Sequence, residues 1–187
     1  MYNFTFNIPT KIHFGKDTIS SLSELKAYGS KVLLVYGGGS IKKNGLYDTA
    51  MKILKDAGLT VFELSGVEPN PKIETVRKGV EICKNEGIDM VLAIGGGSTI
   101  DCSKVVAAGA KYDGDAWDLV LDGSKVKAAL PIFDVLTLSA TGTEMDPFAV
   151  ISDMSKNEKW GTGSPYMVPT IWVMFLLFQI RKRQIQK

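Results

Sequence analysis

Histidine is almost absent from this sequence, because the 187 residues include a single one, His13. A metal centre built from several histidines is therefore excluded within the chain. His13 lies in the run 11–14, which alternates polar and apolar residues as a β-strand does. We therefore expect His13 to occupy an ordinary strand position, and we predict no catalytic residue and no metal ligand in this chain.

Cysteine and clustered positive charge are also scarce. The two cysteines, Cys83 and Cys102, lie in apolar helical patterns, with a spacing that fits neither a disulfide framework nor a zinc site. They predict reduced, buried thiols in a cytoplasmic protein. Residues 1–6 lack the basic and apolar regions of a signal peptide. With a formal net charge of +2 and no basic face in the body of the chain, nucleic acid is not an expected partner.

What the sequence does contain is an alternation of apolar strands and amphipathic helices. The expected strands cover residues 31–36, 60–65, 89–94 and 131–138, and the expected helices cover 18–28, 46–57, 72–86, 98–109 and a short piece near 117–121. Asp17 is expected to cap the first helix. Hairpins are expected from 2–8 with 11–14 and from 148–151 with 158–161. The order predicts an α/β fold with an open, mainly parallel Rossmann-like sheet, whose ligands bind at the carboxyl ends of the strands.

The strongest candidate site is the run Gly95–Gly96–Gly97–Ser98–Thr99–Ile100–Asp101, which follows an apolar strand and opens a helix. The amide N–H groups and the dipole of a helix N-terminus attract phosphate, so the three glycines favour close approach of a pyrophosphate. The alternative is a simple turn in which Ser98 and Asp101 form a variant capping box. The run is neither the usual dinucleotide fingerprint nor a P-loop.

A second glycine run, Gly37–Gly38–Gly39–Ser40, follows the strand at 31–36, where an adenosine ribose often lies in doubly wound sheets. The run contains no acid that would accept the ribose hydroxyls and repel a 2′-phosphate. Its serine and the following Lys42 and Lys43 suit that phosphate, so NADP(H) is favoured over NAD(H). Taken alone, the run is equally consistent with a turn.

Two further features have both a structural and a functional interpretation. The run 137–143 contains four hydroxyl residues and a glycine, which fits a polar turn or a loop that contacts ribose or nicotinamide. Asp101 and Lys104 lie three residues apart on one helix face, where a surface ion pair is the default. A role of Asp101 towards a ligand is the alternative, because it follows the helix N-terminus closely.

These motifs together resemble the iron-containing alcohol dehydrogenase family, in its butanol dehydrogenase-like branch. The matching segments lie within residues 1–169 and are Phe4–Pro9, Ile12–Gly15, Tyr36–Ser40, Pro69–Pro71, Gly95–Lys104 and Leu136–Glu144. The resemblance implies an N-terminal dinucleotide-binding domain like that of dehydroquinate synthase, followed by a helical metal-binding domain. It also implies hydride transfer between NAD(P)H and a primary alcohol or aldehyde such as butanol or butyraldehyde, assisted by Fe²⁺ or Zn²⁺.

The resemblance also assigns cofactor-binding residues. By motif match, Gly37, Gly38, Gly39 and Ser40 hold the adenosine 2′-phosphate, and Gly95, Gly96, Gly97, Ser98 and Thr99 hold the pyrophosphate. Thr137, Leu138 and Ser139 contact ribose and nicotinamide, Asp101 approaches the nicotinamide end, and Lys159 approaches the ribose. Asn70, in the matching segment Pro69–Pro71, is also assigned to the cofactor.

The chain departs from the family in lacking the helical domain, whose metal ligands are an aspartate and three histidines. We expect a dinucleotide-binding domain over 1–169 and an atypical tail over 170–187, which fits a truncated, out-of-frame end. The alternative is a tail that sits at a membrane interface, since eleven apolar residues are too few to span a bilayer. Alone, the chain is expected to be inactive and to self-associate, a homodimer being one possible form. The rival functions are a non-catalytic nucleotide-binding module and a membrane-associated accessory protein.

Overall fold

The computed structural model describes residues 8–175, and its centre is one parallel sheet of six strands. The order across the sheet is β1-β8-β5-β4-β2-β3, and every neighbouring pair runs parallel. The strands are β1 Lys11–Gly15, β2 Lys31–Tyr36, β3 Thr60–Leu64, β4 Met90–Gly95, β5 Ile132–Leu136 and β8 Ile171–Phe175. The expected α/β fold with a parallel, Rossmann-like sheet is confirmed.

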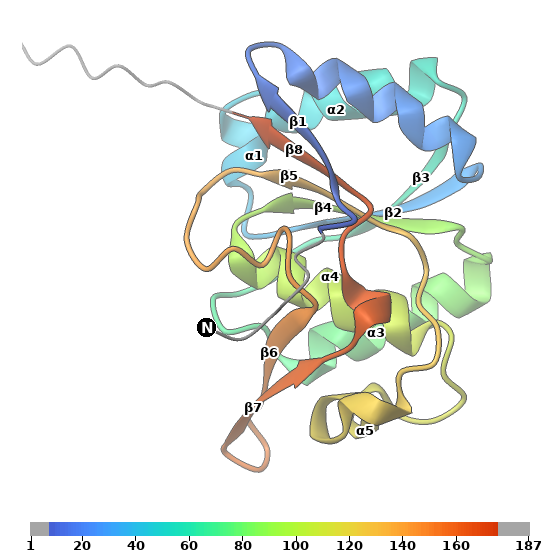
Figure 1. Ribbon diagram of the computed structural model, residues 1–187. Coiled ribbons are helices and arrows are strands. Elements are labelled where there is room, and N and C mark those ends of the chain that lie inside the picture. The colour runs from blue at the N-terminus through green and yellow to red at the C-terminus, as the bar shows by residue number, and fades with distance from the viewer. Residues whose placement is uncertain (1–7, 176–187) are drawn as a thin grey trace, which may run out of the picture.

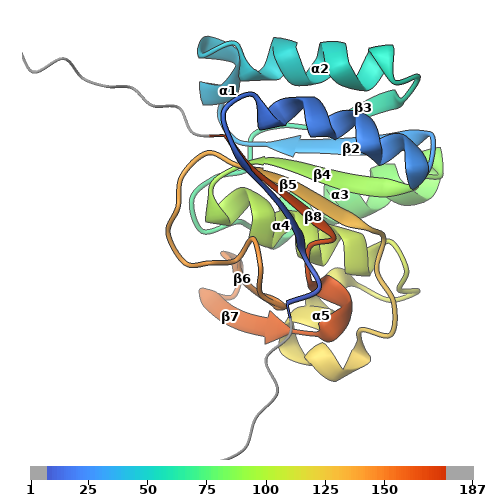
Figure 2. The ribbon, with the colours of Figure 1, turned by 45° about the horizontal axis from the view of Figure 1, so that its top comes forward.

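Helices cover both faces of this sheet, as Figures 1 and 2 show. On one face lie the 3-10 helix η1 (Thr18–Ala27), α1 (Ser40–Lys43) and α2 (Leu46–Asp56). On the other face lie α3 (Ile73–Glu86), α4 (Gly97–Gly109) and α5 (Ala116–Leu121). Two short 3-10 helices, η2 (Gly123–Lys125) and η3 (Pro165–Met167), complete the list. Because both faces are covered, the central strands β2, β4 and β5 are mainly apolar rather than alternating, with the buried Asp134 of β5 as an exception.

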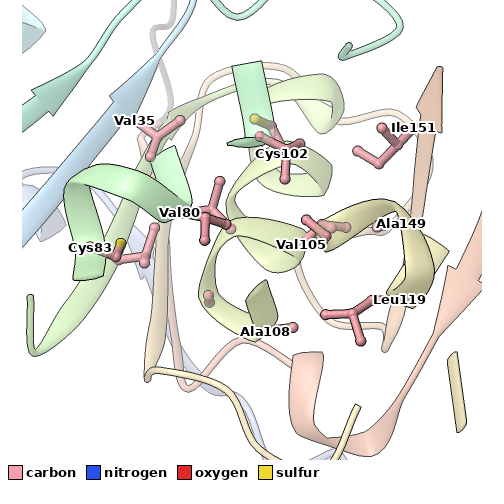
Figure 3. Packing of buried hydrophobic residues seen from close by; sticks show 14 of the residues in the cluster. Val35, Val80, Cys83, Cys102, Val105, Ala108, Leu119, Ala149 and Ile151 are labelled. Atoms are coloured by element: carbon pink, nitrogen blue, oxygen red, sulfur yellow. The ribbon is translucent and has the colours of Figure 1, made fainter. Parts of the chain in front are cut away.

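A two-stranded antiparallel ribbon, β6 (Phe148–Asp153) with β7 (Glu158–Gly163), packs beside α4. This is the second hairpin that the sequence predicted. The ribbon and α3 enclose α4, so that Val105 and Ala108 are buried among side chains from several elements (Figure 3). Gly79 of α3 lies against Val106, with no room for a Cβ, which lets the two helices approach closely. α4 is therefore packed between the sheet, α3 and the ribbon over most of its length.

The N-terminal expectations are tested only in part. Residues 2–7 of the expected hairpin lie outside the described residues, and the described partner of β1 is β8, which runs parallel to it. Asp17 makes no side-chain cap and has a left-handed φ of 62°. The helix that follows is 3-10 because it is rich in serine: the Ser21 hydroxyl donates to the Thr18 carbonyl at 2.7 Å, and Ser20 and Ser23 make the same type of bond.

The expectation that an atypical tail begins at residue 170 also needs correction. Residues 171–175 form β8, which lies between β1 and β5 and holds both in the sheet. Ile171 and Val173 are buried in the core. The remaining residues, 176–187, lie outside the described part. Within residues 8–175, no helix is long and apolar enough to cross a membrane.

Candidate functional site

A cavity of about 690 Å³ opens at the carboxyl ends of the central strands. The chain leaves β2 for β3 on one side and returns to β4 on the other side of β2, so the strand order reverses between β2 and β4. Ligands of open α/β sheets bind at such a switch point. The walls come from the segments after β2, β3, β4 and β5 and from the ribbon: Gly38, Val67, Pro69, Asn70, Pro71, Gly96, Gly97, Ser98, Thr99, Asp101, Leu138, Ala140, Thr141, Val150 and Lys159.

The floor of the cavity is the turn from β4 into α4. Gly96 is the N-cap residue and no side chain caps the helix, so the alternative interpretation of Ser98 and Asp101 as a capping box is wrong. The amides of Thr99 and Ile100 donate to the Gly96 carbonyl at 3.0 and 3.3 Å. The amides of Gly97 and Ser98 have no acceptor among the described residues, as expected in a first helical turn. The cavity therefore contains two free N–H donors at the positive end of a helix dipole, which suits an anion.

The three glycines of this turn serve different purposes. A Cβ at Gly95 would lie 2.8 Å from Thr99 Cβ, so Gly95 is needed for the packing of the protein itself. A Cβ at Gly96 or Gly97 would meet nothing closer than 3.8 and 3.5 Å, and one at Gly38 would meet nothing within 4 Å. The missing side chains at Gly96, Gly97 and Gly38 therefore leave open space in the cavity wall that a ligand can occupy.

The first glycine run contributes less than the sequence predicted. Of Gly37–Ser40, only Gly38 lines the cavity. Gly39 is required by its φ of 106°, which serves the turn into α1. Lys42, suggested as a partner for a 2′-phosphate, instead places its ammonium 5.0 Å from the Tyr36 ring centre and 4.5 Å from that of Tyr47. Its preferred contact is therefore with aromatic rings rather than with the cavity.

One pair of predicted residues is joined directly. The Lys159 ammonium, on β7, donates to Asn70 Oδ1 at 2.6 Å, and both side chains line the cavity. Asn70 adopts a left-handed φ of 55° between Pro69 and Pro71, which fixes the rigid loop that the two prolines predicted. This pair links the ribbon to the loop after β3 and places a positive charge at the cavity wall.

The loop after β5 contributes part of what was expected. Leu138 and Thr141 line the cavity, and Leu138 is 69% exposed. Thr137 does not line it, because its amide continues the sheet by donating to the Gly95 carbonyl at 2.9 Å, and Ser139 does not line it either. Val67 and Val150 were missed. Val150 lies in an expected strand, but its hydrophobicity does not show that the ribbon brings it to the cavity, and Val67 is a single apolar residue in the loop after β3.

Asp101 and Lys104 do not form the surface ion pair that their spacing favoured. Lys104 is wholly buried, and its ammonium lies 2.9 Å from Asp146 Oδ1 and 2.9 Å from Thr143 Oγ1. Asp101 accepts from Thr143 Oγ1 at 2.6 Å and from the Val150 amide at 3.0 Å, and it lines the cavity. Burial raises the pKa of Asp101, although these two hydrogen bonds and the charge of Lys104 oppose it.

The described residues do not fit a catalytic metal. No group of three or more His, Cys, Asp or Glu side chains within residues 8–175 is arranged to hold one. His13 Nε2, on β1, lies 3.3 Å from Glu24 Oε1 and away from the cavity. Cys83 and Cys102 are buried and free, as predicted, and burial raises the pKa of each thiol to about 12. The glycine turn instead offers free amide donors beside an open stretch of cavity wall.

A parallel sheet with an anion-binding helix N-terminus at its switch point defines a Rossmann-like α/β domain. The model of the iron-containing alcohol dehydrogenase family matches residues 9–175, and this chain belongs to that family. It corresponds to the N-terminal domain only.

Several characterised relatives and solved structures are similar to this domain. NADH-dependent butanol dehydrogenase A of Clostridium acetobutylicum is 59% identical over 175 residues, which are 93% of this chain and 45% of that protein. NADPH-dependent aldehyde reductase YqhD of Escherichia coli is 40% identical, with 93% and 45% covered. The structure of NADH-dependent butanol dehydrogenase A from Thermotoga maritima matches with a TM-score of 0.90 and 49% identity, covering 93% of this chain and 44% of that one. The chain thus spans about half the length of these relatives.

Proposed function

We propose that this chain is the dinucleotide-binding half of a metal-assisted alcohol dehydrogenase or aldehyde reductase. The observation that supports this most directly is the free space above Gly96 and Gly97 beside two unpaired amide donors. The bound nicotinamide supplies or accepts the hydride. The substrate class, a primary alcohol or aldehyde such as butanol or butyraldehyde, is proposed from the names of the relatives.

In this proposal each wall of the cavity has a distinct task. The amides of Gly97 and Ser98 donate to the pyrophosphate, and Gly38 leaves room for the adenosine end. Lys159, held by Asn70, lies ready to donate to a ribose hydroxyl or a phosphate oxygen. Asp101 accepts hydrogen bonds from the donor groups of the other half of the ligand, because its carboxylate would be repelled by phosphates.

The choice between NADPH and NADH rests on residues 37–40, which contain no carboxylate that would repel a 2′-phosphate. Lys42 does not add to this preference, because its ammonium contacts two tyrosine rings. Glu63, on β3, accepts from the hydroxyls of Tyr36 and Tyr47 at 2.6 and 2.8 Å, so it is not free to hold a ribose diol. We therefore propose that both cofactors bind, with NADPH preferred by less than about tenfold.

The test is a calorimetric titration of the chain with NADPH, NADH and ATP. Both dinucleotides are expected to bind more tightly than ATP, and a dinucleotide at 100 times its Kd is expected to stabilise the fold by about 2.7 kcal/mol. Tighter binding of ATP would reject the dinucleotide assignment and favour a nucleotide-binding module of another kind. The absence of a metal-ligand group within the described residues favours one second candidate, a module that binds the dinucleotide without catalysis.

The cellular setting is part of the same proposal. Two buried, free thiols suit the reducing cytoplasm, where we place the chain.

Leu138, Phe148 and Trp160 are exposed apolar side chains, which favours self-association, with a homodimer as the expected form. Sedimentation velocity over a range of protein concentrations tests this, since a monomer at every concentration would contradict it.

A further inference from the structure

A buried ammonium group beside the cavity is the least expected feature of the molecule. Lys104 lies on α4 with no exposed surface, although lysine is almost never fully buried without a partner. Its Nζ lies within 2.9 Å of four acceptors: Thr143 Oγ1, the Asp146 carbonyl, Asp146 Oδ1 and the Phe148 carbonyl. Lys104 therefore ties α4 to the loop after β5 and to the first residue of β6.

The direction of the hydrogen bonds around Thr143 follows from the chemistry of the groups. An ammonium group has only donors, so Thr143 Oγ1 must accept the bond from Lys104 at 2.9 Å. The single hydroxyl proton of Thr143 is then free to be donated to Asp101 Oδ1, which lies 2.6 Å away. The chain of bonds thus runs in one direction, from the ammonium through the hydroxyl to the carboxylate.

The second oxygen of Asp101 is held as well. Asp101 Oδ2 accepts from the Val150 amide at 3.0 Å, so the carboxylate is fixed between the loop after β5 and the ribbon. Both Asp101 and Val150 line the cavity. The two hydrogen bonds from Thr143 and the Val150 amide leave the other lone pairs of the Asp101 carboxylate free to accept hydrogen bonds from a ligand in the cavity.

We propose that Lys104 and Thr143 are positioning residues, which hold the Asp101 carboxylate in the wall of the cavity for the nicotinamide ribonucleoside half of the dinucleotide. This inference rests on the proposed function, because it requires a dinucleotide in the cavity. Neither residue lines the cavity, so they act on the ligand only through Asp101.

The charges around Lys104 are consistent with an ionised Asp101. The acidic groups that act on Lys104 are Asp146, Asp101 and Asp134 of β5, and Glu144 in turn acts on Asp134. Asp134 is buried, neither of its carboxyl oxygens has a hydrogen-bond partner among the described residues, and burial together with Glu144 raises its pKa well above the ordinary value. Burial lowers the pKa of Lys104, although Asp146 and Asp101 oppose it. The ammonium is thus matched mainly by Asp146 and Asp101.

The test compares Thr143→Val, which replaces the hydroxyl with a methyl group, with Thr143→Ser, which keeps the hydroxyl. Thr10→Val is the matched control, because Thr10 is also buried and its hydroxyl donates to the Pro169 carbonyl. Thr10 directly precedes β1, so it lies at the amino ends of the parallel strands. Titration of the Asp101 carboxyl carbon by NMR is expected to show its pKa rising by about one pH unit in Thr143→Val, because a donor to the charged form is lost. Thr143→Ser and Thr10→Val are expected to match the unchanged protein.

Binding is measured on the same proteins with NADPH, NADH and ADP, which lacks the nicotinamide ribonucleoside. Thr143→Val is expected to weaken both dinucleotides about tenfold and ADP less than about twofold, with Thr143→Ser restoring the affinity. An unchanged Asp101 titration overturns the relay. Equal losses for ADP and dinucleotide, or none, overturn the positioning role. If the unchanged protein binds no dinucleotide, the proposed function fails, and the Asp101 titration still decides whether the relay exists.

Discussion

The glycines of the turn before α4 separate packing from ligand binding at the scale of single residues. Gly95→Ala is expected to destabilise the fold by about 1–3 kcal/mol, because the new Cβ overlaps Thr99. Gly96→Ala is expected to change stability by less than about 0.5 kcal/mol, because its Cβ enters open space and its φ of −91° suits any residue. We expect Gly96→Ala nevertheless to weaken NADPH and NADH about tenfold, by obstructing the cavity.

Denaturant unfolding and calorimetric titration of the two variants check this prediction. Each variant acts as the control of the other, because the same methyl group is added one residue apart. A Gly96→Ala protein that binds dinucleotide as tightly as the unchanged chain would show that the ligand does not approach this turn.

Asp89 gives a second prediction at the residue scale, away from the cavity. Its Oδ2 accepts from the amides of Ser30 and Lys31 at 2.7 and 2.9 Å and joins the entries to β2 and β4. These bonds hold the pKa of Asp89 below its ordinary value. Asp89→Ala is therefore expected to cost about 1–2 kcal/mol at pH 7. Because the folded pKa is the lower one, this contribution is complete above about pH 4 and is lost as the pH falls through the folded pKa.

Denaturant unfolding of Asp89→Ala at pH 7 and again in acid tests this sign. The control is Asp113→Ala, since Asp113 is exposed and has no hydrogen bond among the described residues. A loss of stability that stays constant with pH would show that the charge of Asp89 is not the cause.

Single residues could be predicted where the sequence pattern that identifies them is local, and not where distant segments of the chain bring them to the site. Gly96, Gly97 and Ser98 were found because a glycine turn between a strand and a helix is a local pattern. Val150 was not found, because only the antiparallel pairing of distant segments brings it to the cavity. The burial of Lys104 was not predictable either, because its acceptors come from a loop about 40 residues further along the chain.

Among the elements, the sequence predicted those whose periodicity is strong and whose ends are marked by glycine. The strand at 31–36 and the helices ending before Gly58 and Gly87 agree closely with β2, α2 and α3. The pairing of β1 with β8 was not predicted, because the two strands are separated by almost the whole chain. Nothing local in the apolar run after Pro169 distinguishes a buried strand from the start of an apolar tail.

The place of β8 gives a prediction at the element scale. Among the described strands, β1 has β8 as its only neighbour, so removing β8 leaves β1 unpaired and uncovers the partners of Ile171 and Val173. The chain 1–169 is therefore expected to be less stable than 1–175 by about 3 kcal/mol or more, from these two side chains alone. Thermal unfolding of the two proteins measures the difference. Equal transition temperatures would show that β8 does not contribute to the folded sheet.

At the scale of the whole molecule, the cavity of residues 8–175 contains the groups that the proposed nucleotide needs, and the described residues include no group of three or more His, Cys, Asp or Glu that could hold a metal. Its wall contributes amide donors, an ammonium and one carboxylate. The only histidine of the chain lies on β1, outside that wall. This 187-residue chain is therefore expected to bind the nucleotide without catalysing turnover.

We expect NADPH to bind to the chain while butyraldehyde-dependent oxidation of NADPH stays at the rate without protein, with Fe²⁺ or Zn²⁺ added. The physical reason is that a carbonyl needs an electrophile to stabilise the charge that develops on its oxygen during hydride transfer, and the described residues contain no metal-ligand group to hold one. The loss of absorbance of reduced nicotinamide measures the rate, and Gly96→Ala serves as the binding-deficient control. A metal-dependent rate that rises with protein concentration and falls in Gly96→Ala would show that this chain completes the active site by itself.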